Sequence, residues 1–223
     1  IKGAGDWEAS YPDYLGQCHS LDENVGRLID TLKEHKLWEN TILFYTSDHG
    51  CHFCTRNQEY KRSCHESSIH IPLLAAGGAF KGGKKIPNLV SLMDLPVTLL
   101  DCAGIEKPED FQGRSLKVLA EGTAQNWEDC VFLQISESEV GRAIRTSRWK
   151  YCVVAKEDPW NCSGADIYYE KYLYDLEKDP CENENLIKFP GYEGVKKELR
   201  DKLKEYMKKA GEAVPEIRSW QEA

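Results

Sequence analysis

The stretch from residue 41 to residue 50 places the strongest constraint on how this chain can fold. The run Ile42–Thr46 carries no charge and contains aromatic and β-branched side chains, which is typical of a strand buried on both faces. Polar and small residues, 47–50, follow at once. In open α/β sheets ligands bind at the carboxyl ends of the strands, so this position favours a metal or a phosphate-like ligand. Gly50 allows a sharp turn there because it has no Cβ.

The acid and the imidazole of Asp48 and His49 are the candidate metal ligands. An ionised carboxylate and a neutral imidazole both bind divalent cations. Neighbouring residues of a strand point to opposite sides, so both can reach one ion only where the strand ends and the backbone twists. Taken alone, the dipeptide favours the ordinary interpretation, a solvated turn after a strand.

Two further residues are candidates for catalysis. Lys61 offers a compact positive charge to an oxyanion, although a single lysine is by default an exposed surface residue. His65 could donate to an anion or protonate a leaving oxygen, and the alternative is a buried, hydrogen-bonded histidine. Cys51-x2-Cys54 with Cys64-His65 departs from the usual spacing of zinc ligands, so zinc is not favoured.

The first half of the chain has the pattern of an α/β protein. Apolar residues recur at three- and four-residue steps over residues 12–36, which predicts a helix with one apolar face. Residues 41–46 and 71–76 are predicted strands. Residues 89–103 are predicted to form a helix interrupted at Pro96, with Gly104 as its C-cap.

After about residue 125 the pattern changes to short strands in close succession. We expect four of them, at Cys130–Ile135, Gly141–Thr146, Trp149–Val154 and Tyr172–Leu176. Their spacing predicts an antiparallel sheet. A C-terminal helix follows, with one apolar face formed by Val195, Leu199, Leu203 and Met207. The predicted organisation is therefore an α/β part, residues 1–124, and a small α+β part, residues 125–223.

Composition and charge narrow the classes of protein. The formal net charge of −8 argues against nucleic-acid binding, which requires a basic face. No apolar run approaches the ~18 residues of a membrane span, so no membrane partner is expected. Nine cysteines leave at least one thiol without an intrachain partner, which favours a reducing, cytoplasmic compartment and leaves a periplasmic or secreted location open. Because the chain starts at Ile1 rather than Met, we expect a fragment or a processed product.

Five ordered segments resemble the sulfatases of the alkaline phosphatase superfamily, over nearly the whole chain. They are Tyr14–Leu28, Asn40–Gly50, Lys61–Leu73, Leu92–Leu116 and Arg142–Leu186. The resemblance implies part of an alkaline-phosphatase-like sheet-and-helix core, followed by a small α+β subdomain with an antiparallel sheet.

The resemblance also implies sulfate-ester hydrolysis, with one calcium ion and a formylglycine nucleophile. Asp48 and His49 would be calcium ligands, and Lys61 would contact the sulfate oxygens and stabilise charge on the leaving oxygen. The expected substrate is a sulfated small molecule or carbohydrate. The segment 51–57 is where such enzymes vary, so His52 and Arg56 are candidates for substrate contact, with a surface loop as the alternative.

The departures from the family pattern concern the nucleophile. No cysteine or serine here stands in a Cys/Ser-x-Pro/Ala-x-Arg motif, and the paired aspartates of the family's N-terminal strand and its upstream histidine are also missing. The family would place them before Ile1, so we expect the C-terminal part of a sulfatase, inactive by itself. The family usually has Arg where His70 stands.

Two alternatives remain open. The first is another hydrolase of the superfamily that acts on phosphonate or phosphodiester substrates and shares the Asp-His strand. The identity of the nucleophile would distinguish it from a sulfatase. A non-catalytic remnant acting as a binding module is the second alternative, and metal titration would separate it. The sequence does not specify the sugar, the identity of the metal or the oligomeric state.

Overall fold

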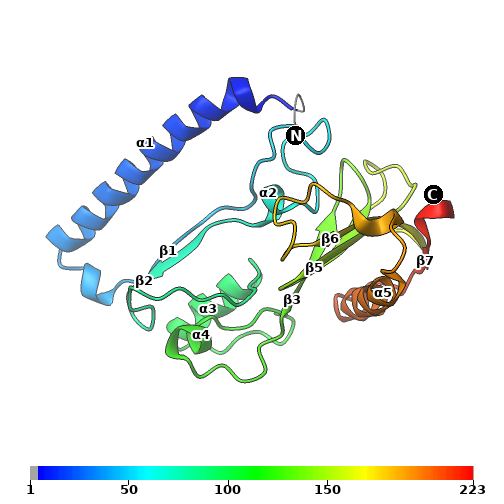
Figure 1. The fold of residues 1–223 in the computed structure, drawn as a ribbon. Coiled ribbons are helices and arrows are strands. Elements are labelled where there is room, and N and C mark those ends of the chain that lie inside the picture. Colours follow the sequence, from blue (N-terminus) through cyan, green and yellow to red (C-terminus); the bar gives the residue numbers. More distant parts are fainter. Residues whose placement is uncertain (1–4, 223) are drawn as a thin grey trace. The chain divides into compact units, whose positions relative to one another are not determined.

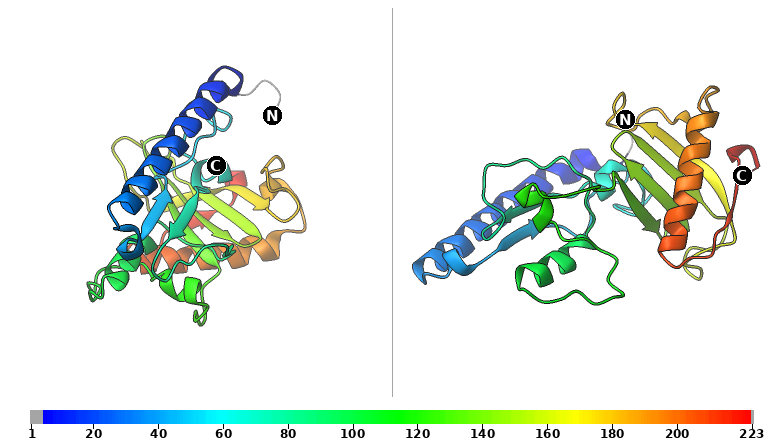
Figure 2. Two further views of the ribbon diagram at one scale, coloured as in Figure 1. Left: turned by 90° about the vertical axis from the view of Figure 1, so that its left-hand side faces the viewer. Right: turned by 90° about the horizontal axis from the view of Figure 1, so that it is seen from below.

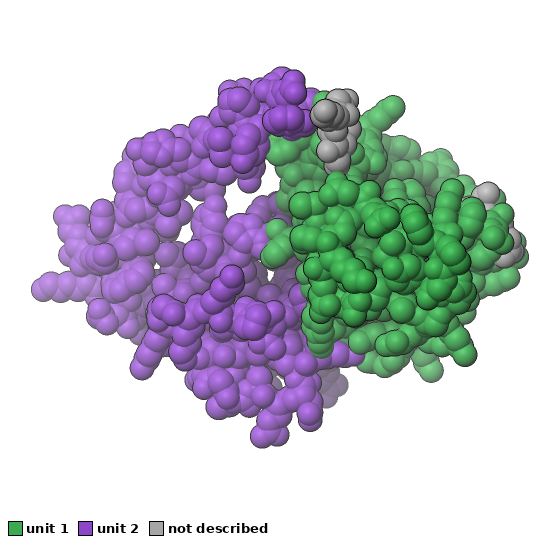
Figure 3. Space-filling model, viewed as in Figure 1, with its two compact units in different colours: residues 1–5, 50–70, 129–223 green, residues 6–49, 71–128 purple. Residues whose placement is uncertain are grey.

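The computed structural model describes residues 5–222, shown in Figure 1. These residues divide into two compact units, coloured separately in Figure 3. The N-terminal unit comprises residues 6–49 and 71–128. The C-terminal unit comprises Gly5, residues 50–70 and residues 129–222. The change of unit falls near the predicted boundary after residue 124, but the segment 50–70, predicted to belong to the α/β part, is grouped with the C-terminal sheet.

The N-terminal unit holds four helices and two strands. Their bounds are α1 Trp7–Glu34, the 3-10 helix η1 Trp38–Asn40, β1 Leu43–Thr46, β2 Leu73–Ala76, α3 Asp94–Cys102 and α4 Lys117–Glu121. β1 and β2 pair antiparallel, with Leu43 opposite Ala76 and Thr46 opposite Leu73. Both strands were predicted from their uncharged runs.

The helix predicted for residues 12–36 is confirmed as α1, which begins five residues earlier and includes Pro12. None of its residues is buried. Tyr14, Leu15, Leu21 and Leu28 on the predicted apolar face are 46–50% exposed. The periodicity therefore predicted the helix, while its apolar face lies largely in solvent.

The strand β1 is less buried than its sequence predicts. All four of its residues are half-buried. Within residues 5–222 its only strand partner is β2, so the burial on two faces that a wide sheet provides is missing. Ile42 and Phe44 pack with Leu73 and Ala75 against a small core of Phe80, Leu116 and Ala120.

The predicted interrupted helix is shorter than expected. It begins at Asp94, whose carboxylate accepts the backbone N–H of Ser91 at 2.9 Å. Pro96 is the third helical residue, in the first turn, where its missing N–H costs no helical hydrogen bond. The cap residue is Ala103, and Gly104 follows with a φ of 70°. Glycine is favoured in this left-handed conformation just beyond a helix.

The C-terminal unit is built on a five-stranded mixed sheet. Its strands, in spatial order, are β3 Cys130–Ile135, β4 Gly141–Thr146, β5 Trp149–Val154, β6 Ile167–Asp175 and β7 Glu216–Arg218. The first four are antiparallel as predicted, and β7 adds a parallel edge strand. The remaining elements are α2 Glu66–Ile69, η2 Leu186–Lys188, α5 Glu193–Lys209 and η3 Trp220–Glu222.

Both faces of this sheet are covered. α5 lies across one face, as Figure 2 shows, and buries Leu199, Leu203 and Met207 as predicted. The segment 50–70 supplies Cys64 to the other face, where it packs with Cys152. Successive residues of a strand point to opposite faces, so two separate cores form. None of the helices within residues 5–222 combines the length and apolar character needed to cross a bilayer.

Candidate active site

The predicted metal ligands lie directly after β1 in the N-terminal unit. Asp48 Oδ2 is 3.3 Å from His49 Nε2, and Asp48 Oδ1 accepts the backbone N–H of His49 at 3.0 Å. The hydroxyl of Ser47 donates to the carbonyl of His49 at 2.8 Å. The Asp48 side chain is 81% exposed and that of His49 is 41% exposed. The turn thus presents a carboxylate and an imidazole side by side to solvent.

This pair fits part of a divalent-cation site. Calcium takes about six to eight oxygen ligands, and a solvent-facing carboxylate is a suitable one. No cluster of three or more histidine, cysteine, aspartate or glutamate side chains suited to a metal occurs in the described part of the chain. Asp48 and His49 would therefore hold an ion only together with further donors.

The candidate His65 is buried in the C-terminal unit, with both ring nitrogens in hydrogen bonds. Nδ1 is 3.1 Å from the hydroxyl of Ser63, and Nε2 is 3.2 Å from that of Tyr174. Burial, and then the nearby charges of Arg56 and Lys150, lower the pKa of His65 to about 3. The imidazole is therefore neutral near pH 7, as a hydrogen-bonding group between two hydroxyls.

The backbone around Lys61 is held in place on several sides. The Lys61 carbonyl accepts the N–H of Ser63 at 2.7 Å. The carbonyl of Arg62 accepts hydrogen bonds from Asn57 and from Ser138, each at 2.9 Å. Lys61 itself is half-buried. The lysine thus projects from an ordered segment that is fastened to the end of the C-terminal sheet.

The two predicted substrate contacts have different environments. The guanidinium of Arg56 donates to the carbonyls of Glu182 and Cys181, at 2.8 and 2.7 Å, and so ties the segment 50–70 to residues 181 and 182. His52 is only 2% exposed, and neither of its ring nitrogens has a hydrogen-bond partner within residues 5–222. Burial, and further the charge of Arg56, lowers the pKa of His52. A buried polar group without a partner is uncommon and marks a place where a ligand could bind.

A buried ionic network, which the sequence did not reveal, holds this segment on the sheet. Lys150, fully buried, is 2.7 Å from Glu66 Oε1 and 2.5 Å from Glu182 Oε1. Arg145 lies 3.4 Å from Glu66, whose backbone N–H donates to Glu182 at 2.8 Å. Burial alone would raise the pKa of Glu66, but the charges of Lys150 and Arg145 outweigh it and lower that pKa. These residues lie in segments that resemble the family, but Glu66 and Glu182 are 116 residues apart in the sequence. No local sequence pattern could therefore show that they pair.

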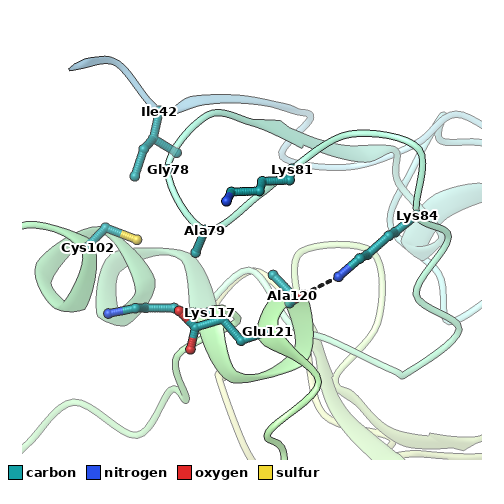
Figure 4. Close-up of a pocket in the computed structure, with 9 residues that line it drawn as sticks. All are labelled: Ile42, Gly78, Ala79, Lys81, Lys84, Cys102, Lys117, Ala120 and Glu121. Atoms are coloured by element: carbon teal, nitrogen blue, oxygen red, sulfur yellow. Dashed lines mark hydrogen bonds between the residues drawn. The ribbon is translucent and has the colours of Figure 1, made fainter. Parts of the chain in front are cut away.

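A separate pocket of about 490 Å³ lies in the N-terminal unit, beside the start of β1 (Figure 4). Three lysines line it, Lys81, Lys84 and Lys117. Lys84 donates to the carbonyl of Ala120 at 3.0 Å, and Lys117 lies 3.7 Å from Asp101. None of the predicted site residues lines this pocket.

The six predicted site residues thus fall into two groups. Asp48 and His49 form one turn of the N-terminal unit. The other four belong to the segment 50–70 of the C-terminal unit, where Arg56 contributes to the electrostatic environment of both His52 and His65. The segment 50–70 therefore carries the ammonium of Lys61, the imidazole of His52, whose ring nitrogens have no hydrogen-bond partner in the described residues, and the neutral imidazole of His65.

Comparison with known proteins identifies the family. Residues 58–209 match the C-terminal domain of N-sulphoglucosamine sulphohydrolase, and residues 3–105 match the sulfatase domain. The chain belongs to the sulfatase family of the alkaline phosphatase superfamily, in agreement with the five sequence segments.

Individual relatives are sulfatases. The chain is 36% identical to human arylsulfatase K over 188 residues, which is 79% of this chain and 33% of that protein. It is 31% identical to an N-acetylglucosamine-6-O-sulfatase of Bacteroides thetaiotaomicron, over 92% of this chain and 37% of that protein. A solved structure in complex with its substrate D-glucosamine-2-N,6-O-disulfate has a TM-score of 0.72 and 29% identity, over 89% of this chain and 40% of that one. The chain spans about a third of the length of these curated relatives.

Proposed function

We propose that this chain forms part of the active site of a sulfuric ester hydrolase that acts on a sulfated carbohydrate. The observation that carries the proposal is the solvent-facing Asp48–His49 pair at the end of β1, in a chain of the sulfatase family. Two relatives support the substrate class, the N-acetylglucosamine-6-O-sulfatase and the protein solved with D-glucosamine-2-N,6-O-disulfate. A formylglycine nucleophile and further metal donors belong, in this proposal, to polypeptide upstream of residue 1.

Asp48 and His49 are the residues that would hold calcium, since a hard carboxylate oxygen suits that ion. When bound, calcium supplies Lewis-acid polarisation of the sulfate oxygens. Lys61 places an ammonium where negative charge develops on the leaving oxygen. A point charge on a flexible stem suits this role better than the planar fork of arginine.

The other residues of segment 50–70 orient the substrate and the lysine. His65 is proposed to support the reacting centre as a neutral positioning group inside segment 50–70, because both of its ring nitrogens are hydrogen-bonded, to Ser63 and Tyr174, and its lowered pKa leaves it uncharged at neutral pH. His52 is proposed as a substrate contact on the strength of its unpartnered ring nitrogens. Arg56 is proposed as a substrate contact that is anchored by the carbonyls of Cys181 and Glu182.

The test compares two lysines in the polypeptide expressed with its upstream coding region, using an aryl sulfate and calcium at neutral pH. Lys61→Ala is expected to lower kcat/KM by roughly 10²–10³, the usual cost of deleting one preorganised charge-stabilising group. Lys61→Arg is expected to restore little. The exposed Lys81, varied to alanine, is the matched control and should retain the wild-type rate.

Two outcomes would contradict the proposal. Equal and small effects at Lys61 and Lys81 would remove the lysine from the site. Turnover of a phosphonate ester in place of the aryl sulfate would favour the related phosphonate hydrolases. The 223-residue chain alone should not turn over the aryl sulfate, and turnover by it would show that the nucleophile lies within these residues.

A further inference from the structure

The side chain of Trp160 is the most exposed of the large apolar side chains in the described residues, at 67%. It belongs to the loop of residues 155–166, which joins β5 to β6 at one end of the C-terminal sheet (Figure 1). A single exposed apolar residue is common on protein surfaces and by itself indicates nothing. The surroundings of Trp160 distinguish it from that ordinary case.

The loop that carries Trp160 is held firmly. The backbone N–H of Trp160 donates to the Asp158 carboxylate at 3.0 Å, and that of Cys162 donates to the Asp158 carbonyl at 3.0 Å. The buried Arg142 donates to the Ser163 carbonyl at 2.7 Å. Cys162, two residues after the tryptophan, packs against the main core. An aromatic ring on an anchored turn loses little conformational entropy when a ligand covers it.

One face of the indole is already covered by a residue next to the candidate catalytic lysine. Arg62 Cζ lies over the Trp160 ring, 5.6 Å from its centroid. Arg62 directly follows Lys61, and consecutive Cα atoms are only ~3.8 Å apart. Since the ring is largely exposed despite this contact, its other face is open to solvent. Trp160 is thus coupled through Arg62 to the segment that carries the proposed catalytic group.

The charges around the ring indicate which part of a glycan fits. Arg62 forms ion pairs with Glu59, at 3.3 Å, and with Glu137. Its positive charge is therefore matched, and the flanking carboxylates would repel a sulfate group. Carboxylates accept hydrogen bonds from sugar hydroxyls, while the C–H face of a pyranose is apolar and packs on an indole face. This combination suits an uncharged sugar ring.

From these contacts we propose that Trp160, backed by Arg62 and flanked by Glu59 and Glu137, is a binding site for an unsulfated sugar unit that neighbours the sulfated unit of the substrate. The site rests on the proposed sulfatase function and adds the requirement that the substrate is at least a disaccharide. It makes Trp160 a specificity-determining residue that contacts the sugar and takes no part in sulfate transfer.

The test is a titration of the 223-residue chain with the neutral disaccharide N,N′-diacetylchitobiose, followed by the indole N–H signals in NMR. We expect the Trp160 signal, assigned by its absence in Trp160→Phe, to shift in a saturable way. Affinities of the variants, which lack this signal, are measured by calorimetry, where Trp160→Ala should weaken binding by at least about tenfold, as truncation of a stacked aromatic anchor does. Trp160→Phe should retain most of the affinity because it keeps a ring face. Trp7→Ala, at a 44% exposed tryptophan of α1, is the matched control and should bind as the wild type does.

Each result decides the matter separately from the sulfatase proposal. An unmoved Trp160 signal, or equal affinity in wild type and Trp160→Ala, overturns the sugar site whatever Lys61 does. Sugar binding at Trp160 together with an inert Lys61 leaves the sugar site standing and removes the sulfatase mechanism. The exposed position of Trp160 means that Trp160→Ala should keep the wild-type circular dichroism spectrum and urea midpoint. A variant that failed this check would be replaced by Trp160→Gln, judged by the same affinity criterion.

Discussion

Mild acid should destabilise the C-terminal unit through His65, and the substitution His65→Gln isolates this effect. In the folded chain the imidazole is buried between Ser63 and Tyr174, and its pKa is lowered to about 3 from an ordinary value of 6.5. Glutamine keeps a polar group that can reach the same partners but has no proton to titrate.

The direction of the pH effect on stability follows from which state, folded or unfolded, binds the proton. Below pH 6.5 the unfolded chain protonates His65, while the folded chain does not until the pH approaches 3. Protons therefore stabilise the unfolded state, and the stability present above pH 6.5 is lost as the pH falls. Between pH 7 and pH 5 the loss from this one group is about 2 kcal/mol. The glutamine variant should lack that part of the loss.

The assay is urea unfolding at pH 7 and pH 5, followed by tryptophan fluorescence, for wild type and His65→Gln. The difference between the two proteins in their pH 7 to pH 5 change should be about 2 kcal/mol. His52, whose pKa is also lowered, is present in both proteins and so cancels in the comparison. The same pH dependence in both proteins, or a His65 ring that titrates near its ordinary pKa in NMR, would refute the reasoning.

Three further outcomes follow from the described contacts. Lys150→Met should destabilise the C-terminal unit by about 3–5 kcal/mol in urea unfolding, because the buried carboxylate of Glu182 loses its cation and Glu66 keeps only Arg145. The exposed-site control Lys197→Met is expected to cause no loss. Gly50→Ala should lower the melting temperature, since a Cβ there would lie 2.1 Å from the Ser67 carbonyl, whereas Gly16→Ala meets no atom within 4 Å and should be neutral or slightly stabilising. Asp48→Ala in the polypeptide with its upstream region should lose calcium affinity in calorimetry, whereas the control Asp22→Ala should keep the wild-type affinity. Unchanged calcium affinity in Asp48→Ala would remove Asp48 from the metal site.

Local sequence determined those elements whose signal is contained in a few neighbouring residues. β3, β4 and β5 have the predicted bounds because short strand-forming runs in close succession are a local property of the sequence. The apolar face of α5 is buried as its three- and four-residue spacing predicts. The polar cluster after β1 was equally visible, because a strand followed by Asp48, His49 and a glycine needs no distant partner to be recognised.

Long-range pairing decided what the sequence could not. β6 begins five residues before its predicted start, since Ile167–Tyr169 are paired with β7, nearly fifty residues further along the chain. No sequence pattern in the segment 50–70 predicts that it packs against the C-terminal sheet. Only the fold brings Lys150 to Glu66 and Glu182.

The same distinction applies to the candidate site. The sequence supplied the candidate residues, because residue type and motif order are properties of the chain itself. Burial decided the ionic state of His65, since its low pKa arises from desolvation and nearby cations that no linear pattern displays. The contact of Arg62 with Trp160 likewise joins residues from two distant loops. Charge, exposure and contact depend on three-dimensional neighbours, and therefore only the tertiary structure decided them.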